Sequence, residues 1–274
     1  MKFKIIAYNI LTGLCDWDFS NKLPVIDKKR LSLAKKLIKQ ENPDILCLTE
    51  AFFSSKNYKG VYMDYQEIFN YPYVDVRKSN VILSKFPIIY SKEFGKQGHN
   101  HKGLGLYCQV MVGKKNIPIS LIHPNIWANE SKRLELIKDL FDEKNNMIIC
   151  GDFNSISKSD NYSKEFAENF RKKVIFRHNG KGDLKNSNTI MKDTFNPKVV
   201  KYIEKKGFVD TYKLKNNKFD FTVPTDFLSK DKSTGIRIDF IFVRWLKVLD
   251  AGIIKNSLSE KASDHYPVYA VLEI

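Results

Sequence analysis

The feature that most constrains this chain is an apolar run that stops at an acid and an amide. In "IICGDFNSIS" (148–157), three apolar residues and a glycine lead directly to Asp152, and Asn154 follows two positions later. A short apolar run bounded by turn-forming residues is typical of a buried β-strand. The two polar side chains at its end either form a turn or belong to a site built on the strand.

Polar side chains flank or interrupt other apolar runs in the same way. They are Asn9 after "IIAY", Glu50 after "DILCLT", His123 after "IPISLI", Asp239 within "IRIDFIFV", and Asp264 with His265 before "YPVYAVL". In layered sheet folds, strand ends and their loops are where sites are assembled on a rigid scaffold. The pattern therefore predicts a site built from several strand ends.

Strands outnumber helices in the expected order of elements. Strands are expected at 3–10, 44–50, 79–88 (broken at Pro87), 104–112, 117–123, 146–152, 236–245, 248–255 and 263–274. Helical stripes are expected within 27–43, within 130–144 and around 197–206. Adjacent strand pairs and strand–helix–strand units both occur, which predicts mixed sheets. Residues 157–195 are the least regular, and 176–188 are interpreted as a long surface loop.

No Pro- or Gly-rich linker and no fixed-period repeat divides the chain, so residues 1–274 are expected to form a single domain. The N-terminal apolar stretch is too short for a signal peptide, and no run is long enough to cross a bilayer. The four cysteines form no Cys-x-x-Cys pair, and Cys47 and Cys150 lie in apolar runs as core residues do. These features favour a soluble cytoplasmic protein.

The formal net charge of +15 leaves two explanations open. It suits a polyanionic partner such as nucleic acid, with DNA as the first choice, or an anionic membrane surface. It also follows from a genome rich in A and T codons, because most of the positive charge is Lys and the chain is rich in Ile and Asn.

The polar residues at the strand ends have a specific chemistry. Carboxylate and amide oxygens are hard ligands that suit Mg²⁺, with Mn²⁺ as a substitute, rather than zinc. A histidine acts as a base or donates to an oxyanion, and a neighbouring Asp fixes its tautomer. Together these groups are suited to metal-assisted displacement at phosphorus. The chain has neither a P-loop nor a nucleophile elbow.

The same residues carry a resemblance to a known family. The segments are "AYN", "PDILCLTE", "VILSKFPI", "LIHPN", "IICGDFNS", "GFVDTY", "RIDFIFV" and "SDHYPV". Over nearly the whole chain, their order resembles the endonuclease/exonuclease/phosphatase superfamily, the Mg²⁺-dependent phosphodiesterases related to exonuclease III, DNase I and neutral sphingomyelinase. The resemblance implies an α/β (α+β) fold: a four-layer α/β/β/α sandwich of two packed mixed β-sheets flanked by helices, DNase I-like.

The resemblance also implies which residues handle the metal and the substrate. Glu50 matches the principal metal ligand, with Asn9 and Asp264 assigned to the same metal site. His123 takes the place of a residue that contacts the phosphate, and Asn125 beside it is assigned to substrate binding.

The remaining roles concern the reaction itself. Asp152 and Asn154 match the pair that orients the attacking water and contacts the phosphate. His265 matches the catalytic histidine, and Asp239 matches the carboxylate that orients it.

Each residue also has an ordinary structural explanation. Glu50 alone is explained as an acid in the first turn of a helix, and Asp152 as a turn residue. Arg237 and Asp210 are expected to be structural. His101 and Lys102 are weak candidates for a substrate loop.

The substrate is the least determined part of the prediction. The abasic-endonuclease branch usually has Gln-Glu-x-Lys around its metal glutamate and a Trp before its Arg-x-Asp strand. This chain has "LTEAF" and "KDKSTGIRIDF" instead, which does not favour abasic-site specificity. A nuclease acting on DNA is the first choice. The alternatives are a phospholipid head group, an inositol phosphate or a tyrosyl-DNA adduct.

Overall fold

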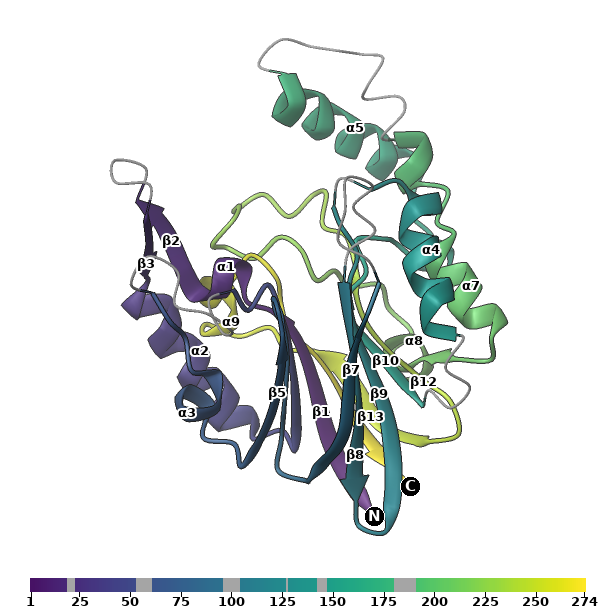
Figure 1. Cartoon of the computed structure of the whole chain (residues 1–274). Helices are drawn as coiled ribbons and strands as arrows, with labels where there is room; N and C mark the ends of the chain where they lie inside the picture. The colour runs from purple at the N-terminus through teal and green to yellow at the C-terminus, as the bar shows by residue number, and fades with distance from the viewer. Residues whose placement is uncertain (19–22, 53–60, 96–103, 127, 142–146, 180–190) are drawn as a thin grey trace.

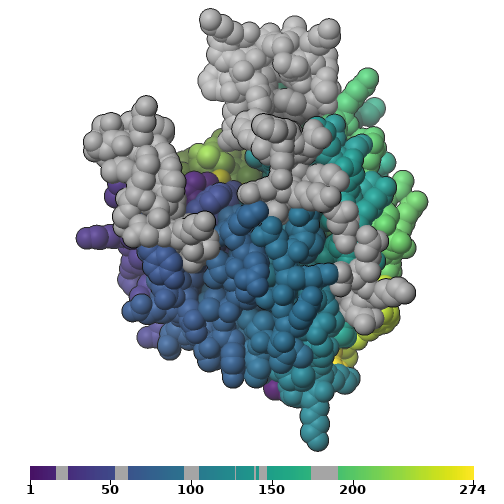
Figure 2. Space-filling model, viewed as in Figure 1, coloured from purple at the N-terminus to yellow at the C-terminus, as the bar shows by residue number. Residues whose placement is uncertain are grey.

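The computed structural model describes residues 1–18, 23–52, 61–95, 104–126, 128–141, 147–179 and 191–274. Two six-stranded sheets pack face to face, and helices cover their outer faces (Figure 1). In the space-filling view, the blue and teal segments form a continuous surface over this side of the body (Figure 2). The predicted four-layer α/β/β/α sandwich is confirmed.

The first sheet has the strand order β13–β14–β1–β4–β6–β5. Its strands are β1 (Lys2–Asn9), β4 (Ile45–Thr49), β5 (Tyr73–Arg77), β6 (Asn80–Ser84), β13 (Lys247–Ile253) and β14 (Val268–Glu273). The strands β1 and β4 are parallel, and the other neighbours are antiparallel, so this sheet is mixed as expected.

The second sheet has the order β11–β12–β10–β9–β8–β7. Its strands are β7 (Ile88–Phe94), β8 (Leu104–Val112), β9 (Lys115–His123), β10 (Ile148–Asp152), β11 (Val209–Asp210) and β12 (Asp239–Val243). The parallel pair here is β9 with β10. A separate hairpin of β2 (Cys15–Asp18) and β3 (Leu23–Ile26) stands beside the first sheet.

Three apolar layers hold these elements together. The layer between the two sheets includes Cys47, Cys108 and Cys150, all fully buried. The outer layers lie under the helices of each sheet. These helices are α2 (Lys28–Glu41), α3 (Tyr65–Phe69) and α9 (Ser259–Ala262) on the first sheet, and α4 (Glu130–Phe141) and α7 (Val199–Lys205) on the second. Central strands buried on both faces explain the near-continuous apolar runs in the sequence.

The helix α2 follows from local sequence signals. The Asp27 side chain caps its first turn by accepting hydrogen bonds from the backbone N–H groups of Lys29 and Arg30. Asn42 ends the helix in the left-handed conformation, one residue before Pro43. The predicted helical stripe within 27–43 is therefore confirmed.

Arg30 is a fully buried cation on the inner face of α2. Its guanidinium donates to the carbonyl oxygens of Cys15, Ala262, Ile10 and Leu11 at 2.8–3.3 Å. A side chain of α2 thus fixes both α1 (Leu11–Leu14), which follows β1, and the end of α9, which precedes β14.

The interpretation of 157–195 as the least regular part of the chain is wrong for much of its length. A 16-residue helix, α5 (Lys164–Asn179), lies in it and projects beyond the end of the sheets (Figure 1). The first four residues of the predicted loop 176–188 are helical, and 180–188 lie outside the described residues. The strand β5 and the hairpin β2–β3 were also not predicted. Among the described residues, no helix is long and apolar enough to cross a membrane.

Gly151 is required by the approach of two strands. Its backbone has a φ of +125°, and a Cβ placed there would lie 2.2 Å from the carbonyl oxygen of Ile122 on β9. Because that neighbour is backbone, it cannot move aside as a flexible side chain can. The strand that leads to Asp152 therefore needs glycine immediately before it.

We predict that Gly151→Ala lowers the free energy of unfolding by about 3 kcal/mol or more, because the added methyl group meets a backbone oxygen. Urea denaturation measures this loss. The control is Gly207→Ala, where φ is also positive (+83°) but the nearest atom lies 3.9 Å away. That change should cost only the conformational strain, about 1 kcal/mol. Equal losses in the two variants would contradict the steric explanation.

Candidate active site

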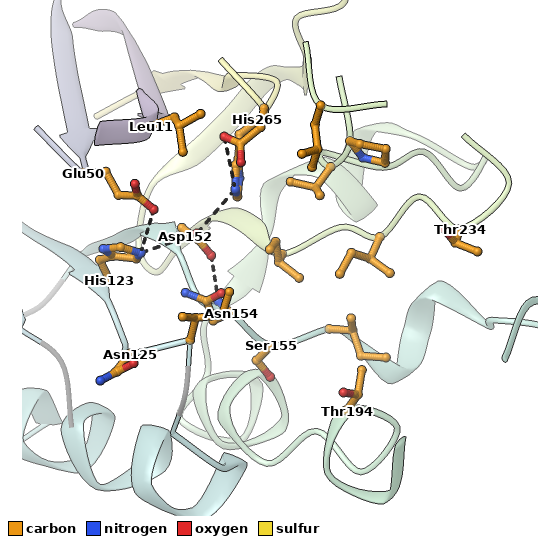
Figure 3. Close-up of a pocket in the computed structure, with 18 of the residues that line it drawn as sticks. Leu11, Glu50, His123, Asn125, Asp152, Asn154, Ser155, Thr194, Thr234 and His265 are labelled. Carbon is orange, nitrogen blue, oxygen red and sulfur yellow. Dashed lines mark hydrogen bonds and ion pairs between the residues drawn. The ribbon is translucent and has the colours of Figure 1, made fainter. Parts of the chain in front are cut away.

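The strand ends singled out in the sequence meet at one end of the sandwich. The parallel strands β1 and β4 end side by side at Asn9 and Thr49, immediately before Glu50. In the second sheet, β9 ends at His123 and its parallel neighbour β10 ends at Asp152. The antiparallel strand β12 begins at Asp239, directly opposite Asp152. Figure 3 shows Glu50, His123, Asp152 and His265 around one common space.

The side chain of Asn9 joins the two sheets. Its amide nitrogen donates to Glu50 Oε1 at 3.1 Å and to Asp152 Oδ2 at 3.0 Å. The amide orientation is fixed, because Asn9 Oδ1 accepts the backbone N–H of Leu11 at 3.0 Å. Asn9 is buried, so this amide holds one carboxylate from each sheet at a fixed position.

Glu50 is held by backbone as well as by Asn9. Its Oε2 accepts the N–H of Thr12 at 3.1 Å, and its own φ of +53° is left-handed. That conformation is not the one of an acid in the first turn of a helix. The strained backbone instead directs the carboxylate toward the second sheet.

His123 completes this side of the site. Its Nε2 lies 3.7 Å from both Glu50 Oε1 and Asp152 Oδ2. Two carboxylate oxygens, one amide nitrogen and one imidazole nitrogen thus surround a small space at the floor of a cleft.

His265 and Asp239 form a second link between the sheets. His265 Nδ1 lies 2.8 Å from Asp239 Oδ2, and both residues are buried. Burial alone would lower the pKa of His265, but the carboxylates of Asp239, Asp264 and Asp152 outweigh it and raise that pKa well above the usual value. These acids therefore favour the protonated ring, whose Nε2 lies 3.8 Å from Asp152 Oδ2.

Asp239 and Asp264 are buried carboxyl groups. Burial raises the pKa of each, and the charge of His265 opposes the rise. Asp264 accepts a hydrogen bond from the Ser263 hydroxyl at 3.3 Å and lies 4.0 Å from His265 Nε2. It lines the cleft together with Glu50 and Asp152.

Asp152 also forms the turn that its sequence context allows. Its Oδ1 accepts the backbone N–H of Asn154 at 2.8 Å, while Oδ2 faces Asn9 and the two histidines. Asn154 has a left-handed φ of +47°, and its amide donates to the carbonyl of Pro124 at 3.0 Å. Asp152 therefore serves as turn former and as site carboxylate at once. Asn154 and Asn125 both line the cleft.

The donor set at the floor of the cleft fits a divalent metal ion. Glu50 and Asp152 present two carboxylates that share one neutral amide donor, and hard oxygen ligands of this kind suit Mg²⁺. Ligand atoms of Asp152, Asp239 and His265 also lie within 4.8 Å of one another. The Asp239 and His265 groups already satisfy each other, so the Glu50–Asp152 side is the better place for a cation. The Asn9 oxygen faces Leu11, so Asn9 supports that side through its nitrogen.

Several supporting residues gave no signal in the sequence. The Thr222 hydroxyl accepts the N–H groups of Ile238 and Asp239 at 3.1 and 3.3 Å, which fixes the start of β12. The Ser263 hydroxyl donates to the backbone oxygen of Asn9 at 2.7 Å, which joins the Asp264–His265 segment to β1. Lone hydroxyl groups in loops carry no recognisable pattern, because their role depends on partners far away in the chain.

Arg237 and Asp210 lie away from the cleft, as expected. Arg237 is buried and pairs with Asp160 at 2.9 Å and Asp210 at 2.7 Å. Asp210 also caps α8 (Thr211–Lys215). These ion pairs hold the backbone just before Asp239 in place, and they lie outside the cleft. The suggestion of a substrate loop at His101 and Lys102 falls outside the described residues.

Comparison with known proteins adds a family and a fold. The model of the Endonuclease/Exonuclease/phosphatase family matches residues 6–265. Comparison with curated protein sequences found no match. A conserved protein of unknown function from Enterococcus faecalis has a TM-score of 0.64 at 15% identity, over 98% of this chain and 99% of its own.

Two further solved structures have named activities or ligands. TDP2 from D. rerio, in complex with a single-strand DNA product, has a TM-score of 0.60 at 14% identity, over 100% of this chain and 99% of its own. ANGEL2, a 2′,3′-cyclic phosphatase in complex with adenosine-2′,3′-vanadate, has a TM-score of 0.60 at 17% identity, over 99% and 95%. At these identities the similarity supports a shared fold and nothing more.

We predict that Asp239→Asn lowers the pKa of His265, because the carboxylate 2.8 Å from Nδ1 stabilises the imidazolium. An NMR pH titration of the ring in EDTA measures the shift. Since the folded pKa is raised, the stability due to charged His265 is full below about pH 6.5 and is lost as the pH rises through the folded pKa. This loss should shrink in the variant.

The matched control is Asp250→Asn, on the edge strand β13. It removes an acid that the structure places outside the site, so the titration of His265 should be unchanged. An unaltered His265 pKa in Asp239→Asn would contradict the pairing described above.

Proposed function

Because the chain belongs to the endonuclease/exonuclease/phosphatase family, we propose that it is a Mg²⁺- or Mn²⁺-dependent hydrolase of phosphodiesters, with DNA as the first candidate substrate. The observation that carries the proposal is the pair of cross-sheet contacts, Asn9 with Glu50 and Asp152, and Asp239 with His265. They bring two carboxylates that are held only by neutral donors close to His265.

The proposed water-handling group is Asp152. The acids around His265 favour its protonated form, which has no lone pair on Nε2 to accept a proton from water, and His123 lies on the far side of Asp152 from it in Figure 3. Asp152 is held in place by Asn9 and by the N–H of Asn154, so its free lone pairs can orient an attacking water. A carboxylate in this position acts as the general base.

The proposed role of His265 is to donate its Nε2–H to a phosphoryl oxygen or to the leaving oxygen. The Asp239 carboxylate keeps the ring charged and oriented, as in other Asp–His pairs. His123 and the amide of Asn154 would contact the remaining phosphate oxygens. Fixed donors aimed at charge that develops in the transition state are commonly the largest contribution to catalysis.

Glu50 and Asp152 would hold the divalent metal ion, with Asp264 close by. When bound, the ion supplies Lewis-acid polarisation of the phosphate and compensates the negative charge of these acids. The role of Asn9 is then to keep Glu50 and Asp152 at a constant separation while the ion enters and leaves.

DNA as the substrate has two supports. The net charge of +15 favours a polyanionic partner and predicts salt-dependent binding. The solved structure of TDP2 with a single-strand DNA product gives a fold relative that handles DNA. The solved structure of ANGEL2, a 2′,3′-cyclic phosphatase, gives a fold relative that acts on a cyclic phosphate.

We predict that the protein cleaves plasmid, single-stranded or abasic DNA in Mg²⁺ or Mn²⁺ and that EDTA abolishes cleavage. Asp152→Asn should reduce kcat by about a thousandfold or more, because the amide is a poor base and a weaker metal ligand. Gel and HPLC assays of the products measure both effects. Asp250→Asn is the control and should keep full activity.

Two outcomes would change the proposal. Metal-dependent cleavage that persists unchanged in Asp152→Asn would place the chemistry elsewhere. No cleavage of any nucleic acid, with turnover of other phosphodiesters, would retain the hydrolase and remove DNA from the proposal.

A further inference from the structure

The cleft extends well beyond the group that would hold the phosphate. Its volume is about 670 Å³. Figure 3 shows Glu50 and His123 at one end of the lining and Thr194 and Thr234 at the other, with Asp152 and His265 between. A single phosphate with its metal fills only the first part, so the substrate has room for a large group in the second.

The walls of this second part are mainly apolar. We call it the apolar wing, and its residues are Ile156, Phe170, Val223, Pro224, Leu228 and Ile236. They come from the segment after β10, from α5 and from the segment before β12. Ser155, Thr194 and Thr234 are the uncharged polar residues at its margin.

The apolar wing is built on fixed backbone. Val223 and Ile236 pair across a β-bridge, with the N–H of Ile236 donating to the carbonyl of Val223 at 2.8 Å. The N–H of Tyr266 donates to the carbonyl of Thr222, also at 2.8 Å, which ties this segment to the one that carries His265. A preformed wall beside the reacting group selects its ligand by shape and polarity.

The charges that line the cleft do not favour a second phosphate. Of the described lining residues, the cations other than histidine are Arg133 and Lys173, and each has an acid partner. Arg133 pairs with the buried Glu130 at 3.1 Å, and Lys173 pairs with Asp231 at 2.8 Å. Since both cations are already paired with acids, they offer a second phosphate little attraction along this wall.

Large apolar side chains also stand exposed on the lining. Leu228 is 42% exposed and Ile126 is 61% exposed. Exposed apolar residues that rim a cleft are typical of a surface that meets an apolar ligand. They line the same cleft as Asp152 and His265, so an apolar part of the ligand can be continuous with its phosphate.

From these features we infer that the substrate carries one large apolar arm on its scissile phosphate, alkyl or aryl, and that this arm occupies the apolar wing. The inference rests on the proposed hydrolase function only for the placement of the phosphate. It narrows the substrate class of the proposed hydrolase to phosphodiesters that carry an apolar group on one side of the phosphate, which a DNA end can also carry.

Calorimetric binding of phosphate monoesters tests the inference without turnover. Methyl, hexyl and naphthyl phosphate share one anionic group and differ only in the arm. In Mg²⁺, hexyl or naphthyl phosphate should bind about tenfold or more tighter than methyl phosphate, because each buried methylene contributes roughly threefold. Tighter hexyl binding identifies a flexible alkyl arm, and tighter naphthyl binding identifies an aryl arm. Thymidylyl-thymidine binding more tightly than both would overturn the inference.

Paired variants locate the arm in the structure. Leu228→Ser with Ile236→Thr should remove most of the preference for the long arm and leave methyl phosphate binding unchanged. The control pair is Leu214→Ser with Ile89→Thr, two residues that are 55% and 51% exposed on α8 and β7. The inference fails if methyl and hexyl phosphate bind wild type equally, or if the control pair loses as much preference.

This outcome is separable from failure of the proposed function. If the protein binds the long-armed esters more tightly but hydrolyses no diester, the role of the apolar wing is retained and the hydrolase proposal is overturned. Metal-dependent hydrolysis together with equal binding of all three phosphate esters would retain the proposed hydrolase and overturn the role of the apolar wing.

Discussion

The whole site depends on two polar contacts that cross between the sheets. Asn9 at the end of β1 donates to Asp152 at the end of β10, and His265 before β14 contacts Asp239 at the start of β12. Each contact joins a residue of the first sheet to one of the second. Because both lie over the apolar layer between the sheets, the packing of that layer sets the distances in the site. Gly151 contributes directly, since it lets β10 approach β9 closely enough to place Asp152.

The carboxylates of the site explain why it is suited to a divalent cation. Glu50, Asp152, Asp239 and Asp264 converge on one end of the sandwich together with His123 and His265. Burial and mutual repulsion raise the pKa of Asp239 and Asp264, which shows the cost of this arrangement. A divalent cation would relieve that cost, and in the proposed function it would also attract the negative charge of a phosphate. The apolar wing adds no charge, so the selectivity of the cleft lies in shape and apolar contact.

The sequence predicts the reactive residues of the site better than it predicts the residues that hold them in place. Asp152, Glu50, Asp239 and His265 are recognisable because each ends or interrupts an apolar strand, and β-strands place such ends on one edge. The support comes from Arg30, Thr222 and Ser263, whose partners are distant in the chain. Nothing local distinguishes them from ordinary surface residues. The central strands and α2 were predicted for the same reason, since their periodicity and caps are local signals.

The elements that shape the cleft were harder to predict. The helix α5 has a weak apolar stripe and many charges, so its sequence reads as irregular. Its contacts with the rest of the chain are tertiary: the rings of Phe166 and Phe170 on the helix contact those of Tyr162 and Phe195 from outside it. Propensity alone does not reveal such packing. The proposed substrate class therefore rests on the folded structure, while the proposed reaction class rests on the sequence.

The central claim is that Glu50 and Asp152, held together by Asn9 across the two sheets, form a divalent metal site. An electron paramagnetic resonance titration with Mn²⁺ tests it most directly. The sharp signal of free Mn²⁺ falls as the protein binds the ion, so no turnover is needed. Wild type should bind Mn²⁺, and Glu50→Gln should weaken binding by about tenfold or more. Glu67→Gln, on α3, is the matched control and should bind as wild type does. Equal Mn²⁺ binding by wild type and Glu50→Gln would contradict the account.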